Sequence, residues 1–265
     1  MKPQTGEILL NGEPVLGNSP QIGYMLQHDH LFEWRTIYRN ILLGPEISHT
    51  LNKEIREKAK SMLTQYGLKS FIHARPSQLS GGMRQRAALI RTLLPEPELL
   101  LLDEPFSALD AKIRQQMREE LKKIQSDLGI TVIFVTHDQE EAMALSHRIV
   151  VMNKGKFDQV GTPGEIYDSP ATLHVASFIG EMNFIRNGGS TIAVRPEDIV
   201  VNKGHGPMEA VVRTIMMLGH YVVLTVQRGN EIIKCYVDRE LSDQLREGDL
   251  VNLTIGKHTV FSQAA

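Results

Sequence analysis

Two adjacent carboxylates, Asp103 and Glu104, directly follow a continuous apolar run from Leu99 to Leu102. Such a run is typical of a strand buried on both faces, and ligands bind at the carboxyl ends of strands in open parallel sheets. Adjacent carboxylates there can divide the chemistry, one holding Mg²⁺ and the other orienting or deprotonating a water molecule. The alternative is an ordinary acidic turn, which Pro105 would also fit.

A second continuous apolar run, Thr131 to Val135, leads to His137, and Asp138 follows at the predicted start of a helix. A histidine in this position can carry or transfer a proton near neutral pH, although a lone histidine at a strand end is usually structural. Gln27 ends another apolar segment and can reach a metal ion or a water molecule, but it means nothing alone.

The segment LSGGMRQR, residues 79–86, predicts the start of a helix. Ser80 is expected to cap the helix, and Gly81 and Gly82 leave backbone N–H groups bare in its first turn. A helix start with bare amides is an anion site, because the amides and the helix dipole both favour negative charge. A Ser-capped helix with a glycine-rich entry and no ligand is the alternative.

The elements that must position these residues follow an α/β pattern. Apolar residues at helical spacing predict helices over 55–66 and 113–128, stopped by Gly67 and Gly129. The two apolar runs between and after these helices are expected to be strands buried on both faces. Strand–helix–strand order with such strands indicates a parallel sheet.

The character of the chain changes near Gly180, where we place a domain boundary. From Thr191 onward, short β-rich runs alternate with turns. Residues 221–226 and 231–237, joined through Arg228-Gly229-Asn230, predict a hairpin, and a small β domain is expected after the boundary. A second hairpin is predicted near the start, with Ile8-Leu9-Leu10 as a strand and Asn11-Gly12 as the turn.

The composition fits a folded protein with a core, since 42% of the 265 residues are hydrophobic and 23% are charged. The net charge of -2 gives no electrostatic argument for nucleic-acid binding. The one cysteine, Cys235, cannot form an internal disulfide and is expected to be a small buried residue. No apolar core follows Met1 to Gln4, so no signal peptide is predicted, and no apolar run approaches the ~20 residues that span a bilayer. Any membrane role is therefore expected to come through a partner.

Taken together, the order and spacing of these motifs resemble the ATP-binding cassette ATPases. The resemblance covers Met1 to about Gly180. The segments FIGEMN at 178–183 and VRPE at 194–197 look like the small β domain appended to many importer ATPases. The motifs that carry the resemblance are Gln27 for the Q-loop, residues 79–83 for the signature, Leu99 to Glu104 for the Walker B strand, Ser107 to Asp110 for the D-loop and His137 for the switch histidine.

The resemblance implies the fold. Residues 1–180 would form an incomplete P-loop NTPase-type parallel sheet with a helical subdomain, as in ABC ATPases. Residues 181–265 would form a small all-β, OB-like domain of the TOBE type. The stretch between Asn183 and Val194 is shorter than in relatives, which puts any regulatory ligand site of that domain in doubt.

A Gly-rich phosphate loop, GxxxxGK[ST], precedes these motifs in the family, and the chain contains no such pattern. Gly155-Lys156 and Gly256-Lys257 lack both the upstream glycine and the trailing Ser or Thr. We therefore expect the chain to begin just after the phosphate loop and its helix, through an internal start codon or a truncated gene. On that expectation, the chain alone hydrolyses no ATP, and apolar surface and strand edges of the sheet are exposed.

The resemblance also implies the cofactors, ATP and Mg²⁺, and a role for each residue. In the family, two cassettes close head to tail around two ATP molecules. Asp103 would help hold Mg²⁺ through water, Glu104 would be the general base and His137 would contact the γ-phosphate. Gln27 would sense the metal and the membrane partner. The signature helix would bind the nucleotide held by the opposite subunit through Ser80, Gly81, Gly82 and Gln85. Asp110 would contact the other subunit.

The function implied is that of the ATPase subunit of a membrane importer. Its partners would be a second copy or a paired cassette subunit, transmembrane permease subunits and, indirectly, a substrate-binding protein, with no nucleic acid. It would lie at the cytoplasmic face of the cell membrane. A nucleotide-inert cassette that only docks partners is the alternative, and a cassette protein without a transporter is disfavoured by the β domain.

Two further expectations concern partners and substrate. Leu31, Phe32 and Trp34 lie in the stretch that the transmembrane partner contacts in this family, with a role in the core as the alternative. YMLQHDHLFEWRTI, residues 24–37, resembles nitrate, sulfonate and taurine importer ATPases. GTPGEIY, residues 161–167, and the β tail look like polyamine, iron and oxyanion importer ATPases, which we favour because they share the extra domain.

Overall fold

The structure, a computed structural model, describes residues 5–15, 17, 19–107 and 109–262. The chain forms two compact units, Met1–Leu145 and Ser146–Ala265. The domain boundary predicted near Gly180 lies inside the second unit and stays a prediction. Within the described residues, no helix is both long and apolar enough to cross a membrane.

The first unit opens with the predicted hairpin. Its strands are β1 (Leu9–Leu10) and β2 (Glu13–Pro14), which pair antiparallel. Asn11 and Gly12 form the turn with positive φ angles of 52° and 85°. A two-residue turn of this kind needs φ above zero at both positions, which Asn and Gly adopt most readily. The prediction of a hairpin here is confirmed.

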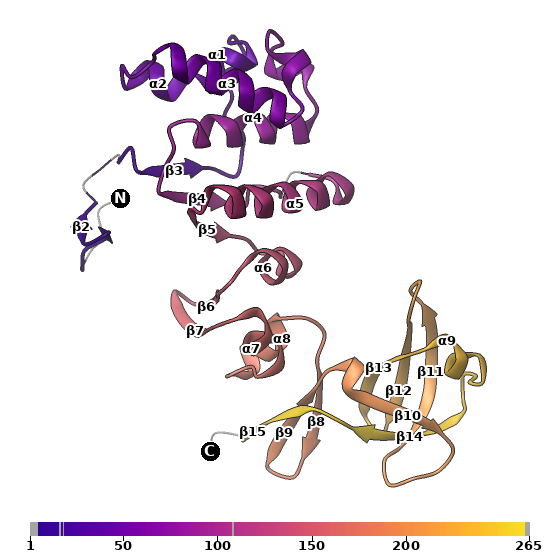
Figure 1. Cartoon of the computed structure of the whole chain (residues 1–265). Coiled ribbons are helices and arrows are strands. Elements are labelled where there is room, and N and C mark those ends of the chain that lie inside the picture. The colour runs from indigo at the N-terminus through magenta and orange to yellow at the C-terminus, as the bar shows by residue number, and fades with distance from the viewer. Residues whose placement is uncertain (1–4, 16, 18, 108, 263–265) are drawn as a thin grey trace. The chain divides into compact units, whose positions relative to one another are not determined.

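A three-stranded parallel sheet forms the centre of the first unit (Figure 1). Its strands are β3 (Ile22–Met25), β4 (Leu99–Asp103) and β5 (Thr131–Val135), in the order β3-β4-β5. The register aligns Met25 with Leu102 and Leu102 with Phe134. The predicted parallel α/β sheet is confirmed, and the loops after the three strands leave the same edge of the sheet.

The prediction that these strands are buried on both faces is wrong for β5. Leu100 and Leu102 of β4 are 0% and 2% exposed, whereas Ile133 and Val135 of β5 are 51% and 53% exposed. Tyr24 of β3 lies in register on the same face as Ile133 and is 53% exposed. Successive side chains of a strand point to opposite faces. Helices pack on the face that carries Leu100 and Leu102, and the other face is only partly covered.

The described residues of the first unit also form six α-helices. The predicted helices are confirmed, and Gly67 and Gly129 follow them with φ angles of 70° and 61°. Both glycines adopt the left-handed conformation that commonly ends a helix. The helices are α1 (Ile37–Ile41), α2 (Leu43–Ile47), α3 (Lys53–Gln65), α4 (Gly81–Leu93), α5 (Ala111–Leu128) and α6 (Gln139–Leu145), with short 3-10 helices at Lys69–Phe71 and Pro76–Gln78.

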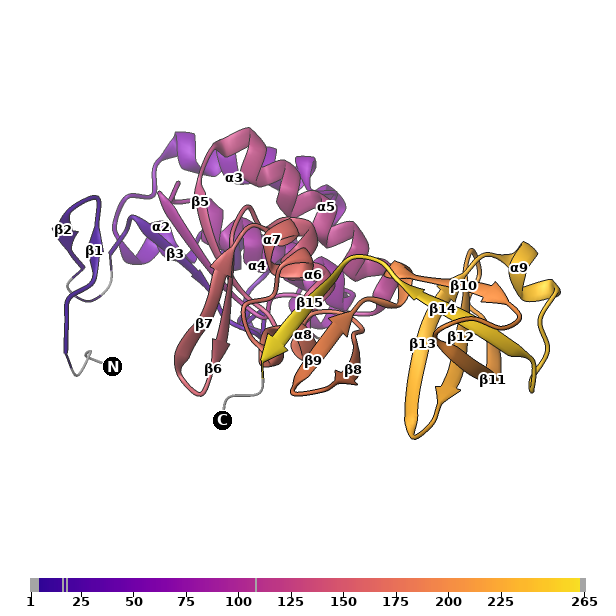
Figure 2. The ribbon, with the colours of Figure 1, turned by 90° about the horizontal axis from the view of Figure 1, so that it is seen from below.

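The second unit is rich in antiparallel strands. It starts with a hairpin and two short helices and continues into two sheets, in the orders β15-β9-β8 and β10-β14-β11-β12-β13 (Figure 2). The hairpin predicted over 221–237 is confirmed as β12 and β13. The elements are β6 (Ile149–Asn153), β7 (Lys156–Gly161), α7 (Pro163–Asp168), α8 (Leu173–Phe178), β8 (Asn183–Asn187), β9 (Ser190–Val194), a 3-10 helix (Pro196–Asp198), β10 (Ile199–Lys203), β11 (Glu209–Met217), β12 (Val222–Arg228), β13 (Glu231–Val237), α9 (Arg239–Asp243), β14 (Leu250–Ile255) and β15 (His258–Ser262).

A buried arginine ties the short helices of the second unit to its sheets. Arg195 is 4% exposed, and its Nη2 donates to the Tyr167 carbonyl at 2.9 Å. Its Nη1 donates to the carbonyls of Ile179 and Glu181. The guanidinium also lies 3.9 Å from the centre of the Tyr167 ring. Cys235 is buried in the core of this unit, as predicted, and burial raises the pKa of its thiol to about 12.

Close packing of α4 on α5 predicts different outcomes for two adjacent glycines. A Cβ added at Gly82 would lie 2.4 Å from Ile113 Cγ2, whereas one at Gly81 would meet Leu109 Cδ2 at 3.6 Å. Alanine improves helix propensity at both positions. Overpacking costs about 1–3 kcal/mol. We therefore expect the free energy of unfolding of Gly82→Ala to be lower than that of Gly81→Ala by about this amount, and its urea midpoint to be lower as well.

Fluorescence of Trp34 is the readout for this comparison, because the only tryptophan lies in the first unit. Equal unfolding midpoints for the two variants would show that α4 and α5 are not packed this closely.

Candidate functional site

The loops after the three parallel strands each contribute one side chain to a cluster centred on a carboxylate. Gln27 follows β3, Glu104 follows β4 and His137 follows β5. Gln27 Nε2 donates to Glu104 Oε2 at 2.9 Å, and His137 Nδ1 lies 3.0 Å from Glu104 Oε1. Each carboxylate oxygen of Glu104 therefore has its own partner. The structure brings together three of the residues that the sequence predicted to be functional.

The backbone at Glu104 is held in an unusual conformation. Its φ angle is 44°, in the left-handed region that side chains other than glycine rarely adopt. The Glu104 amide donates to the Val135 carbonyl at 2.8 Å, and the Glu104 carbonyl accepts from the Ser107 hydroxyl at 3.0 Å. Non-glycine residues persist in this region when their surroundings hold them there, as they often do at functional sites.

The electrostatics of the pair favour a charged histidine. The hydrogen bond from His137 to Glu104, and the attraction between their charges, raise the pKa of the imidazole above its usual value. The His137 side chain is 72% exposed and that of Glu104 is 28% exposed. Protons can therefore be exchanged with water at this pair, because the imidazole is open to solvent.

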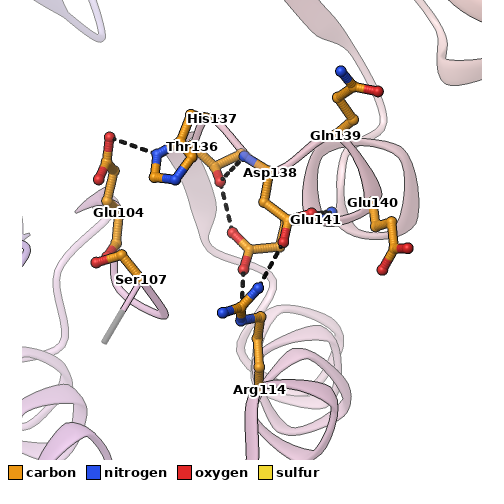
Figure 3. Close-up of a pocket in the computed structure, with 9 residues that line it drawn as sticks. All are labelled: Glu104, Ser107, Arg114, Thr136, His137, Asp138, Gln139, Glu140 and Glu141. Carbon is orange, nitrogen blue, oxygen red and sulfur yellow. Dashed lines mark hydrogen bonds and ion pairs between the residues drawn. The ribbon is translucent and has the colours of Figure 1, made fainter. Parts of the chain in front are cut away.

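A pocket of about 520 Å³ adjoins this pair. Figure 3 shows Glu104 and His137 facing each other on one side, and Arg114 reaching Asp138 and Glu141 on the other. Arg114 comes from α5, and the two acids come from the start of α6 and the loop before it. The pocket is lined by Glu104, Ser107, Arg114, Thr136, His137, Asp138, Gln139, Glu140 and Glu141.

The signature helix begins as predicted. The Ser80 hydroxyl accepts the Met83 amide at 3.4 Å and caps α4, so the predicted cap is confirmed. Ser80 and Gly81 are exposed and Gly82 is buried. Gln85 is 4% exposed, so its side chain lies inside the protein and not at the exposed end of the helix. Its predicted contact with a nucleotide stays a prediction.

Arginines tie the signature helix to the segment after Gln27. Arg84 Nε donates to Asp29 Oδ2 at 2.9 Å. Arg91 donates to the carbonyls of Asp29 and His30 at 2.7 and 2.8 Å. These hydrogen bonds hold the loop after β3 against α4.

Asp103 and Asp110 lie at the two ends of the segment after β4. Asp103 is half-buried at the end of β4, and Asp110 caps α5 by accepting the Ile113 amide at 3.0 Å. Ala108, within the predicted D-loop, lies outside the described residues. Over the part of the chain that the structure describes, no group of three His, Cys, Asp or Glu side chains is arranged to hold a metal ion.

Mg²⁺ binds through one or two carboxylates, several waters and phosphate oxygens, so it does not need such a group. Asp103 and Gln27 end neighbouring strands and carry oxygen ligands of the kind that Mg²⁺ prefers. The residues present therefore fit that ion in its usual manner of binding.

Sequence reasoning missed the charged side of the pocket. Arg114 and Arg118 lie one turn apart on a helix that was predicted, but nothing in the sequence indicated their partners. Their i, i+4 spacing places both on one face of α5, and this was the available signal. Thr136 and Glu141, which flank the loop of His137, were likewise not singled out.

Comparisons with known proteins agree with this geometry. A family model described as ABC transporter matches residues 1–107, and a model described as TOBE domain matches residues 192–261. The spermidine/putrescine import ATP-binding protein PotA of Bacillus cereus is 40% identical over 259 residues, covering 94% of this chain and 79% of the relative. The sulfate/thiosulfate import ATP-binding protein CysA of Thermosynechococcus vestitus is 42% identical over 260 residues, covering 92% of this chain and 77% of the relative.

A solved structure is similar as well. It is cbiO1 from Clostridium perfringens, described as part of the ABC transporter complex cbiONQ, with a TM-score of 0.58 and 26% identity. The match covers 64% of this chain and 71% of that one.

The fold is that of an ATPase of the ABC type. It combines a parallel sheet, a capped helix at the signature motif and three converging side chains, those of Gln27, Glu104 and His137. This chain belongs to the import ATP-binding subunits of ABC transporters, with a C-terminal TOBE domain.

The contact between His137 and Glu104 predicts a titration that NMR can follow. The imidazole should titrate above the ordinary value of 6.5, and Glu104→Gln should lower its midpoint, because the neutral amide favours the imidazolium less. Since the pKa of the imidazole is raised, its positive charge is fully present just below the ordinary histidine pKa and is lost, with the ionic attraction, as the pH rises through the shifted pKa.

The His137 resonances can be assigned with His137→Asn, and the resonances of the other histidines serve as internal controls. An unchanged His137 midpoint in Glu104→Gln would contradict the contact.

Proposed function

We propose that this chain supplies the hydrolytic residues of an importer ATPase, with Glu104 as the general base for the attack of water on ATP. The observation that carries the proposal is the position of the Glu104 carboxylate between Gln27 and His137, at 2.9 and 3.0 Å. A general base must lie within hydrogen-bond reach of the water whose proton it takes. One carboxylate oxygen can release its side-chain partner and accept from water while the other keeps its contact.

The remaining residues have supporting roles in this proposal. His137 orients the Glu104 carboxylate and, as an exposed imidazolium, places positive charge next to the phosphate that is transferred. Gln27 links the carboxylate to the loop that leads towards the membrane partner. Asp103 and Gln27 would hold Mg²⁺, whose charge stabilises the phosphate oxygens during transfer. The exposed amides at the start of α4 would face nucleotide on a paired cassette, and Asp110 would contact that cassette.

The substrate class that we propose is a small ionic solute. Relatives named for spermidine and putrescine and for sulfate and thiosulfate are 40% and 42% identical to this chain. The segment GTPGEIY and the TOBE domain favour the polyamine, iron and oxyanion group over the nitrate, sulfonate and taurine group. The proposed partners are a second cassette, permease subunits and, through them, a substrate-binding protein. This places the chain at the cytoplasmic face of the membrane.

A docking surface for the permease subunits is proposed at the loop after β3. Trp34 is 71% exposed and its ring lies 4.6 Å from that of Phe32, whereas Leu31 is 8% exposed. The alternative, in which all three residues belong to the core, fits only Leu31. An exposed aromatic pair is the kind of anchor that fills a pocket on a partner.

The general base is tested in a chimera that joins a GxxxxGK[ST]-bearing strand, loop and helix of an importer ATPase ahead of Thr5. Glu104→Gln should lower kcat by about 10²- to 10⁴-fold and leave ATP binding intact, because only the proton transfer is lost. Glu119→Gln, an exposed glutamate on α5, is the matched control.

Hydrolysis that survives Glu104→Gln would exclude Glu104 as the base. A folded chimera that binds no ATP would instead favour the nucleotide-inert cassette that only docks partners.

The docking surface is tested in the same chimera assembled with permease subunits in vesicles. Trp34→Ala should weaken permease binding about tenfold or more, because an exposed aromatic anchor is removed. The unfolding midpoint should hardly change. Ile47→Ala, which alters a side chain that is also 71% exposed, is the control outside this segment. Equal permease binding by both variants would place the docking surface elsewhere.

A further inference from the structure

Two arginines of α5 form one wall of the pocket beside His137. Arg114 and Arg118 are one helical turn apart, and their side chains are 29% and 10% exposed. Both reach the same carboxylate oxygen: Arg114 Nη1 and Arg118 Nη2 each donate to Asp138 Oδ2 at 3.0 Å. The other oxygen, Asp138 Oδ1, accepts the Glu141 amide at 3.1 Å. Both oxygens of Asp138 are therefore held.

The same arginines face a second, buried carboxylate. The Glu141 side chain is 3% exposed and lies 3.9 Å from Arg114 Nε and 3.7 Å from Arg118 Nη2. Glu141 Oε2 accepts from the Thr136 hydroxyl at 2.7 Å, and that hydroxyl accepts the Asp138 amide at 3.0 Å. A buried carboxylate is costly unless it is paired and hydrogen-bonded, so these groups hold one another strongly in one arrangement.

The consequence for His137 follows from its place in the chain. Thr136 and Asp138 are its two neighbours, and both are fixed by the network that the arginines complete. The imidazole itself is 72% exposed, so little packing holds it. Its position against Glu104 therefore depends on the backbone on either side.

Arg114 makes one further bond, which links this network to a different loop. Its Nη2 donates to the Leu109 carbonyl at 3.0 Å, in the segment that leads from β4 into α5. Asp110 next to it caps α5 through the Ile113 amide. One guanidinium thus bridges the loop before α5 and the loop that carries His137. Arginine suits this task because its planar fork offers several donors in fixed directions, which the point charge of lysine cannot match.

We propose that Arg114, supported by Arg118, is a positioning residue that couples the segment at Leu109 and Asp110 to His137. A displacement of that segment is passed through the guanidinium to Asp138 and so to the contact between His137 and Glu104. The consequence for turnover rests on the proposed function, in which Asp110 faces a paired cassette. Closure of the pair would then set the histidine in place from a distance.

The His137 titration distinguishes positioning from a simple charge effect, because the two predict opposite signs. Removal of a nearby positive charge favours the imidazolium and raises its pKa. Loss of positioning weakens the hydrogen bond to Glu104 and lowers the pKa towards its ordinary value. The carboxylates that act on the imidazole are Glu104, Glu141 and Asp138, and all three are retained in an Arg114 variant.

The experiment uses the chain as it is, without nucleotide, and follows His137 by NMR. Arg114→Gln should lower the His137 midpoint, and Arg118→Gln should lower it less. Arg114→Lys should not restore it fully, because the link to Leu109 is lost. Lys112→Gln, which removes an exposed positive charge on the same helix, is the control and should leave it unchanged.

Amide hydrogen exchange supplies a second readout that also shows whether each variant is folded. The Glu141 amide should exchange about tenfold faster or more in Arg114→Gln, since its acceptor Asp138 then keeps only one of the two guanidinium groups that hold it. Core amides of β4 should keep their protection. An unchanged or raised His137 midpoint in a folded Arg114→Gln protein would overturn the proposal.

Failure of the inference can be told apart from failure of the proposed function. If Glu104→Gln lowers the His137 midpoint while Arg114→Gln does not, the contact with Glu104 stands and the positioning role is excluded. If neither variant changes the midpoint, the contact on which the proposed function rests is absent, and the inference fails with it.

Discussion

The parallel alignment of β3, β4 and β5 is the constraint on which the rest of the site depends. Parallel strands end at one edge of their sheet, so residues 77 and 33 positions from Glu104 arrive within 3 Å of its carboxylate. None of the three side chains is close to another in the chain. The apolar runs that build the strands therefore set the geometry of a site to which they contribute no polar side chain of the converging three.

The loops at this edge are held by charge and hydrogen bonds as well as by buried apolar side chains such as Phe106 and Leu109. Glu104 keeps a left-handed backbone because its amide is bonded to Val135 and its carbonyl to Ser107. Asp138 and the buried Glu141 are neutralised by Arg114 and Arg118 of α5. Such networks hold one arrangement as long as every member is present, because each buried charge depends on its partner. A site of this kind can respond to movement of a neighbouring helix.

Relatives named for different substrates are similar to this chain over most of its length. Import proteins named for polyamines and for sulfate and thiosulfate match it at 40% and 42% identity over most of its length. In the proposed function, the residues that meet at Glu104 act on ATP whichever solute is imported. This explains why the first unit identifies the family clearly, whereas the substrate class rests on weaker signals in the second unit.

The sequence by itself determined the local elements and the family. Helix ends at Gly67 and Gly129, the Ser80 cap, the hairpins and the strands that lead to Glu104 and His137 all follow from patterns a few residues long. Only the tertiary structure decided which face of β5 is left open, that Gln85 points inward, and that Arg114 meets Asp138 and the Leu109 carbonyl. Periodicity shows that a strand or helix has an apolar face, but what covers that face depends on residues far away in the chain. A charged side chain likewise has no partner until the fold brings one within reach.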